Sequence, residues 1–138
     1  MKAVIPVAGA GTNLRPLTYT QPKPLIPVAG KTIISFIIEQ LLEAGVKDFV
    51  FIIGYLGEKI KNFVEKNYPD LNMEFVNQKE RFGLGHAIWT ARDVLRNEDG
   101  IFIVLGDTIF DVDLEKNVPQ LVVDAWVNDK SAPQQIRL

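Results

Sequence analysis

Short apolar runs alternate along the chain with segments whose apolar residues recur every three or four positions. The runs predict buried strands at Ala3–Ala8 and Phe49–Ile53, a short third strand at Met73–Asn77 and a purely apolar fourth strand at Ile101–Leu105. The segments with helical spacing predict amphipathic helices at Thr32–Ala44, Gly57–Asn67 and Leu84–Arg96. This regular order of strand and helix is typical of a parallel sheet with helices on both faces. We therefore predict an α/β fold with a mainly parallel sheet, in one domain over residues 1–138.

One long connection interrupts this pattern, from Gly9 to Lys31. Four prolines within it exclude a continuous helix, and irregular connections of this length in small domains are commonly functional. Ligands of parallel α/β sheets bind beyond the carboxyl ends of the strands. Three segments are expected to meet there: the loop from Gly9, the loop from Gln78 and the corner at Gly106 and Asp107.

The last part of the chain, from Glu115 to Leu138, has a weaker pattern. Leu121–Val127 is a candidate fifth strand, and the segment from Ser131 to Gln135 is typical of a loop. We find no internal repeat, low-complexity segment or linker along the chain.

The amino-acid composition limits the kinds of partner and bound group that we expect for this chain. The chain is 47% apolar and 23% charged with a net charge of −2, which gives no basic field for nucleic acid. It has no cysteine, which excludes disulfides and thiolate metal sites. No apolar run approaches the ~18 residues of a membrane span. The N-terminal residues lack the cleavage site of a signal peptide, so we expect a cytoplasmic protein without membrane contact.

The glycine-containing turn after the first strand, Gly9-Ala10-Gly11-Thr12, has successive amides that can form an anion-binding concavity. A dinucleotide-binding loop, and with it an NAD-type oxidoreductase, is disfavoured. Leu14 stands where the third glycine is expected, and Pro16 interrupts the helix that should follow. A Walker loop is excluded because no Gly-Lys-Ser/Thr follows. Taken by itself, the segment could equally be a plain glycine turn.

Two neighbouring strings remove much of this ambiguity. Residues 8–18 (AGAGTNLRPLT) and 22–28 (PKPLIPV) resemble the opening signature of the sugar-1-phosphate nucleotidyltransferases. These enzymes make UDP-, dTDP- or GDP-sugars from a nucleoside triphosphate and a sugar 1-phosphate. The resemblance continues to Asp107 and, more loosely, to about Pro133. It implies a three-layer α/β/α Rossmann-like nucleotidyltransferase fold. It also implies transfer from UTP or dTTP to a sugar 1-phosphate, with glucose 1-phosphate expected, and release of pyrophosphate.

The resemblance also implies roles for individual residues. Lys23 would contact phosphate as a point cation, and Asp107 would hold Mg²⁺, which prefers oxygen ligands. Nucleotide binding would involve Ala8, Gly9, Gly11, Thr12, Gln78, Gly83 and Gly106. The alternative interpretations are that Lys23 is a solvated surface lysine, that Gln78 is a plain loop residue and that Asp107 caps the end of a strand.

The segment around Gln78 is expected to read the base. A glutamine amide both donates and accepts, so it can pair with the imide edge of a pyrimidine. The string that follows, residues 83–87 (GLGHA), is closest to bacterial UTP–glucose-1-phosphate uridylyltransferases. We expect His86, the single histidine, to pack or cap rather than catalyse. Asp111 and Asp113 are expected to be surface or turn acids.

One departure concerns catalysis. The family has an arginine after the Gly-Thr pair, where it stabilises the transition state and the leaving pyrophosphate, and this chain has Asn13. Arg15 is a candidate substitute, so the predicted catalytic residues are Lys23, Arg15 and Asn13. Asparagine carries no charge, and loss of such a stabiliser costs on the order of 10²–10³ in rate. The alternative function is therefore a nucleotide-binding module without catalysis.

A second departure concerns length. Family members continue well beyond 138 residues into sugar-binding strands and a second metal-binding aspartate. We expect this chain to be the N-terminal half of a longer nucleotidyltransferase. Surfaces meant for a missing half would favour self-association, so a homo-oligomer is expected in that case.

Overall fold

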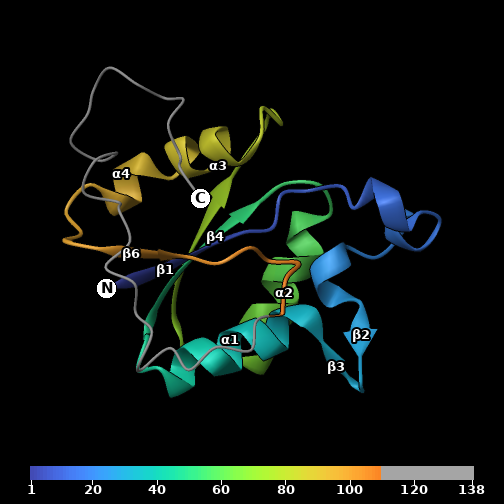
Figure 1. The fold of residues 1–138 in the computed structure, drawn as a ribbon, viewed down its shortest axis with the longest axis horizontal. Helices are drawn as coiled ribbons and strands as arrows, with labels where there is room; N and C mark the ends of the chain where they lie inside the picture. Colours follow the sequence, from blue (N-terminus) through green and yellow to red (C-terminus); the bar gives the residue numbers. More distant parts are fainter. Residues whose placement is uncertain (110–138) are drawn as a thin grey trace.

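Four parallel strands form the sheet in the computed structural model, which describes residues 1–109 (Figure 1). They are β1 (Lys2–Pro6), β4 (Asp48–Ile53), β5 (Asn72–Asn77) and β6 (Ile101–Ile103), in the order β5-β4-β1-β6. Val4 of β1 is paired with Val50 on one side and Ile103 on the other. The prediction of a parallel sheet is confirmed.

Helices cover both faces of this sheet (Figure 1). On one face lie α1 (Ile33–Glu43) and α2 (Gly57–Asn67), and on the other lie α3 (Leu84–Thr90) and α4 (Arg92–Leu95). Alternate side chains of β1 point to opposite faces of the sheet and pack in two different hydrophobic cores. Ile5 packs in the cluster with α1, and Val4 packs in the cluster with α3 and α4. The result is the predicted three-layer α/β/α arrangement.

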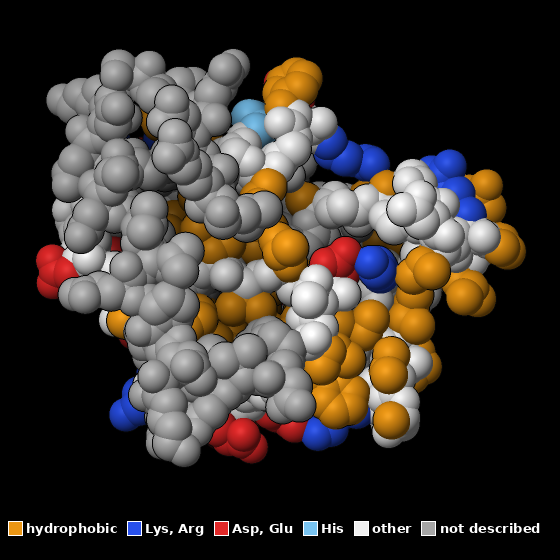
Figure 2. All heavy atoms as spheres, in the orientation of Figure 1, with side chains coloured by type: hydrophobic (Ala, Val, Ile, Leu, Met, Phe, Trp, Pro, Cys, Tyr) orange, Lys and Arg blue, Asp and Glu red, His pale blue; other side chains and the backbone are white. Residues whose placement is uncertain are grey.

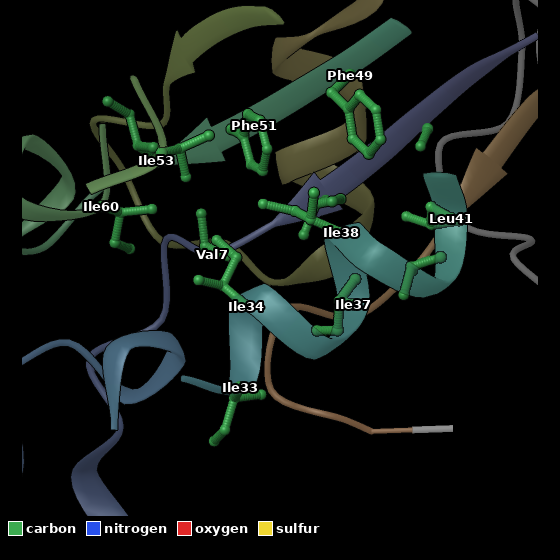
Figure 3. Packing of buried hydrophobic residues seen from close by; sticks show 14 of the residues in the cluster. Val7, Ile33, Ile34, Ile37, Ile38, Leu41, Phe49, Phe51, Ile53 and Ile60 are labelled. Atoms are coloured by element: carbon green, nitrogen blue, oxygen red, sulfur yellow. The ribbon is translucent and has the colours of Figure 1, made fainter. Parts of the chain in front are cut away.

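The larger core lies between α1 and the sheet. Ile34, Ile38 and Leu41 of α1 point toward Phe49 and Phe51 of β4 (Figure 3), and all five side chains are fully buried. Complete burial of one such side chain stabilises the fold by about 1.5–3 kcal/mol. The hydroxyl of Thr32 caps α1 by accepting from the Ser35 backbone N–H at 3.3 Å.

The helix predicted at Leu84–Arg96 is divided at Ala91 into α3 and α4. The Thr90 hydroxyl donates to the His86 carbonyl at 2.8 Å, a bond from side chain to backbone that disturbs helices. The following bonds, from Ala91 to Ile88 and from Val94 to Ala91, tighten to three-residue spacing. The apolar periodicity predicts the helical segment correctly, but it does not predict the division into α3 and α4.

The connection from Gly9 to Lys31 is ordered by short elements. Three 3₁₀ turns come first, at Thr12–Leu14, Leu17–Tyr19 and Lys23–Leu25. A small antiparallel pair of strands follows, β2 (Pro27–Val28) and β3 (Lys31–Thr32). The connection carries exposed hydrophobic side chains, among them Leu14, Leu17 and Tyr19. Hydrophobic side chains are visible on the surface at the right of Figure 2.

The predicted strand Leu121–Val127, the acids Asp111 and Asp113 and the predicted loop near Ser131 lie outside the described residues. Within residues 1–109, no helix is long and apolar enough to cross a membrane.

Candidate functional site

A pocket of about 530 Å³ opens at the carboxyl ends of the strands. β1 leads into Ala8 and Gly9, and β6 leads through Leu105 into Gly106 and Asp107. The chain winds from β1 to β4 and β5 on one side and returns to place β6 on the other, so the strand order reverses between β1 and β6. Open α/β sheets bind ligands at this reversal, because the adjoining loops leave it in opposite directions.

Ten of the eleven predicted site residues line this pocket. They are Ala8, Gly9, Gly11, Thr12, Asn13, Lys23, Gln78, Gly83, Gly106 and Asp107. Arg15 lies outside the lining: its guanidinium stands over the Tyr19 ring, 5.2 Å from the centroid. Arg15 therefore contacts its own loop in this structure, and its suggested catalytic role stays a prediction.

Gly11 is the residue at which the glycine loop reverses direction. Its φ is +58°, and an added Cβ would stand 2.8 Å from Thr18 Cγ2 and 3.3 Å from Lys23 Cβ. The buried hydroxyl of Thr18 donates to the Gly11 carbonyl at 2.7 Å. These contacts hold the loop close to the segment that carries Lys23.

Gly106 allows the end of β6 to approach the end of β1. A Cβ at this position would lie 2.2 Å from Val7 Cγ1 and 3.0 Å from the Pro6 carbonyl oxygen, to which the Gly106 amide donates at 3.3 Å. A larger residue therefore has no room here. This close approach sets Asp107 at the pocket.

Lys23 and Asp107 form an ion pair in the pocket. Lys23 Nζ lies 2.7 Å from Asp107 Oδ2, and the Thr108 hydroxyl donates to Asp107 Oδ1 at 3.1 Å. The bond from Lys23 holds the pKa of Asp107 below its ordinary value, although partial burial acts in the opposite direction. Asp107 is therefore ionised at neutral pH and can act as an anionic ligand.

Of the described residues, 1–109, that line the pocket, Asp107 supplies the one carboxylate. No group of three or more His, Cys, Asp or Glu residues suited to a metal occurs within residues 1–109. Mg²⁺ commonly binds through one or two carboxylates, substrate phosphates and retained waters. The residues present fit an ion shared with a phosphate ligand, and they do not form a complete protein cage.

Gln78 lies just after β5, with only 5% of its surface exposed. Its backbone amide donates to the Ile53 carbonyl at 2.8 Å. Its side-chain nitrogen Nε2 lies 3.3 Å from the Gly83 carbonyl oxygen and 2.9 Å from His86 Nδ1. The sequence interpretation treated His86 as a packing or capping residue and missed its contact with Gln78.

Arg81 is a lining residue that the sequence interpretation also missed. Its guanidinium lies 5.6 Å from the centroid of the Tyr55 ring, and the Tyr55 hydroxyl donates to the Tyr19 carbonyl at 2.9 Å. Arg81 thus brings a second cation to the pocket beside Lys23. Its place between Gln78 and Gly83, in a loop expected to face the ligand, was an available signal.

The sequence matches the nucleotidyl transferase family over residues 2–125. UTP–glucose-1-phosphate uridylyltransferase 1 of Staphylococcus saprophyticus is 37% identical over 134 residues, covering 81% of this chain and 46% of that protein. The chain spans half or less of the length of the curated relatives it matches, from 26% to 49%.

Solved structures show the same likeness. A UDP-glucose pyrophosphorylase complexed with UDP-glucose has a TM-score of 0.74 and 27% identity, covering 83% of this chain and 50% of that one. HddC from Yersinia pseudotuberculosis, complexed with GMP-PN, also has a TM-score of 0.74 and 27% identity, covering 85% and 52%. With the sheet order and the pocket, these matches show that the chain belongs to the nucleotidyl transferase family.

Proposed function

We propose that this chain is the nucleotide-binding part of an enzyme that transfers a nucleotidyl group from UTP or dTTP to a sugar 1-phosphate. Glucose 1-phosphate is the first acceptor to test, because relatives carry the name UTP–glucose-1-phosphate uridylyltransferase. The observation that carries the proposal is the convergence of the glycine loop, Lys23, Asp107 and Gln78 on one pocket at the strand reversal.

The proposed choice of a pyrimidine rests on Gln78, because the fold alone leaves the base open. One related structure is titled a complex with UDP-glucose and another a complex with GMP-PN. Gln78 and Gly83 are brought to the pocket together, where an amide and backbone groups can meet the edge of a base.

The proposed reaction is a single in-line displacement. An oxygen of the sugar phosphate bonds to the α-phosphorus of the nucleotide, and the bond from that phosphorus to the bridging oxygen breaks, so pyrophosphate leaves. Lys23 would bind phosphate charge, and amides of the glycine loop would orient the chain of phosphates. Lys23 must exchange its contact with Asp107 for one with phosphate.

Mg²⁺ is proposed as the metal, with Asp107 as its ligand on this part of the protein. When bound, it would neutralise phosphate charge and hold the reacting phosphates in position. Since Asp107 is ionised at neutral pH, it does not have to lose a proton before it binds Mg²⁺. We also propose that the reaction belongs to nucleotide-sugar biosynthesis in the cytoplasm.

The alternative function is nucleotide binding without turnover. Asn13 lines the pocket and is uncharged, where the family's arginine would bring a cation. The chain would then bind a nucleoside triphosphate through the same groups and leave its phosphates intact.

Pyrophosphate release tests the proposal. This chain and the protein encoded by its complete reading frame are each assayed with UTP, dTTP, glucose 1-phosphate and Mg²⁺. We expect release from UTP or dTTP that requires the sugar phosphate. Lys23→Gln should lower the rate about 10²-fold. Lys47→Gln, which changes an exposed lysine at the opposite end of the strands, should leave it unchanged.

The outcomes separate the two functions. UTP binding without pyrophosphate release from the complete protein supports the binding module. Absence of both binding and release, with every sugar phosphate and nucleotide tested, rejects both.

A further inference from the structure

The side chain of Gln78 is held by two protein groups. Its Nε2 faces the Gly83 carbonyl oxygen at 3.3 Å and His86 Nδ1 at 2.9 Å. A carbonyl oxygen can only accept a hydrogen bond, so the Gln78 atom that faces Gly83 must be the amide nitrogen. This contact fixes which way round the amide lies, independently of any assignment of its nitrogen and oxygen.

The same geometry fixes the state of His86. One amide hydrogen of Gln78 points to Gly83, so the second is directed to His86 Nδ1, which must accept it. A neutral imidazole that accepts at Nδ1 carries its proton on Nε2. Both amide hydrogens are then committed to protein acceptors. The carbonyl oxygen is the group that Gln78 can offer to a ligand in the pocket it lines.

His86 is itself fixed in place. The Phe82 ring meets it edge-on, with centroids 5.2 Å apart, and its carbonyl accepts from the Thr90 hydroxyl at 2.8 Å. The neighbouring residues of α3, Ala87 and Ile88, are buried in the core. A ring anchored in this way can impose an orientation on the flexible glutamine.

We propose that His86 is a positioning residue for base recognition, which holds the Gln78 carbonyl toward the pocket and so selects a pyrimidine that carries a hydrogen on its ring nitrogen N3. Uracil and thymine carry such a hydrogen on N3, whereas N3 of cytosine is an acceptor and would face the Gln78 oxygen unfavourably. The inference rests on the proposed function, since it assumes a pyrimidine nucleotide in this pocket. It adds to that function a role for His86, the tautomer of His86 with its proton on Nε2, and a preference for UTP over CTP.

Binding of UTP and CTP to the complete protein tests the proposal. His86→Phe keeps a ring but removes the acceptor, so the amide can turn over. We expect the ratio of UTP to CTP affinity to fall about tenfold, which corresponds to one hydrogen bond. His86→Asn, whose Oδ1 can take the place of Nδ1 as acceptor, should retain the preference. Binding of inorganic pyrophosphate should not change in either variant.

A second variant shows whether His86 acts through Gln78. In a Gln78→Ala background, His86→Phe should have no further effect on the ratio, because no amide remains to orient. A drop of similar size in that background would contradict the proposal, as would an unchanged ratio in His86→Phe alone.

The tautomer can be measured without any substitution. The ¹⁵N shifts of the wild-type imidazole at neutral pH should show an unprotonated Nδ1 and a protonated Nε2. A proton on Nδ1 overturns the proposal even if His86→Phe does not fold. If the wild type binds UTP over CTP and His86→Phe does so equally, only this inference fails. If the wild type binds neither nucleotide, the proposed function fails as well.

Discussion

Asn13 and Arg15 illustrate how a single side chain decides what the pocket can stabilise. Asn13 lines the pocket without a charge, and Arg15, two residues later, stands over Tyr19. Among the lining residues that the structure describes, the cations are Lys23 and Arg81. The charge that the family places on the glycine loop therefore has no equivalent on this loop at the pocket wall.

Asn13→Arg restores that charge. If the enzyme function holds, pyrophosphate release by the complete protein should rise, by at least about tenfold, because a cation at the leaving phosphates stabilises the transition state. The affinity for UTP should change much less. Steady-state rates and UTP titration check this, with Asn97→Arg as the matched variant: it adds the same charge at an exposed position outside the pocket lining, so little change is expected. An unaltered rate would show that position 13 does not correspond to the family's arginine.

Gly106→Ala tests the close approach of β6 to β1. The added methyl would lie 2.2 Å from Val7 Cγ1, so the strand ends must separate. Forced overpacking of this kind costs about 1–3 kcal/mol. We expect a lower free energy of unfolding in urea and weaker nucleotide binding. Gly9→Ala is the control: a Cβ there meets no atom within 4 Å, so stability should be retained. Equal stability of both variants would contradict the argument.

At the scale of elements, the loop from Gly9 to Lys31 depends on bonds made outside regular structure. Thr18 donates to Gly11, and two side chains of the segment after β4 hold the loop from outside: the Tyr55 hydroxyl reaches the Tyr19 carbonyl, and Lys59 reaches the Thr20 carbonyl. The pocket wall is thus a loop fastened at several points.

Thr18→Val removes the internal fastening with little change of shape. The Gly11 carbonyl loses one of its two donors and keeps the Leu14 backbone N–H at 3.0 Å. This loss should cost about 1 kcal/mol and loosen the glycine loop. We expect faster hydrogen exchange at the amides of residues 11–14 and a severalfold weaker affinity for UTP. Thr18→Ser keeps the hydroxyl and should behave nearly as the wild type. Exchange rates that match the wild type in Thr18→Val would show that the hydroxyl bond is dispensable.

Much of this architecture was predictable, because it depends on periodicity. The strands and the helices α1 and α2 follow from apolar spacing alone. The break at Ala91 lies beside the bond from the Thr90 hydroxyl to the His86 carbonyl, and the contact of Gln78 with His86 joins a strand end to a helix. Neither the break nor this contact leaves a periodic pattern in the sequence from which it could be predicted. The place of Arg15 likewise depends on how its loop packs against Tyr19.

At the scale of the whole molecule, Lys2 joins parts of the fold that are distant in sequence. Its Nζ lies 3.0 Å from Glu74 on β5 and 3.4 Å from Glu98 after α4, and donates to the Val94 carbonyl at 3.0 Å. The hydrogen bond to Glu74, more than any other contact, raises the pKa of Lys2 above its ordinary value of 10.5, although burial opposes this. The first strand is thereby tied to the edge strand β5 of the sheet and to the helical layer that contains α4.

A raised pKa has a definite consequence for stability. The contribution of Lys2 is fully present below pH 10.5 and is lost as pH rises through the higher value of the folded state. Lys2→Met should lower the free energy of unfolding by about 1 kcal/mol at pH 8. The difference from wild type should shrink in alkaline solution above pH 10.5. Lys66→Met, at a lysine without an ion pair among the described residues, is the control variant in the same urea titrations. A constant difference for Lys2→Met would contradict the assignment.

The partners Lys23 and Asp107 stand 84 positions apart in the chain. During synthesis, β1, β4 and β5 can pair as soon as residue 77 has left the ribosome, whereas β6 must still emerge and dock on the other side of β1. We therefore expect most of the main core, except its part around Val104, to form before the ligand pocket. We expect this part of the chain to become competent to bind its ligand only after β6 has docked beside β1 and brought Asp107 to Lys23.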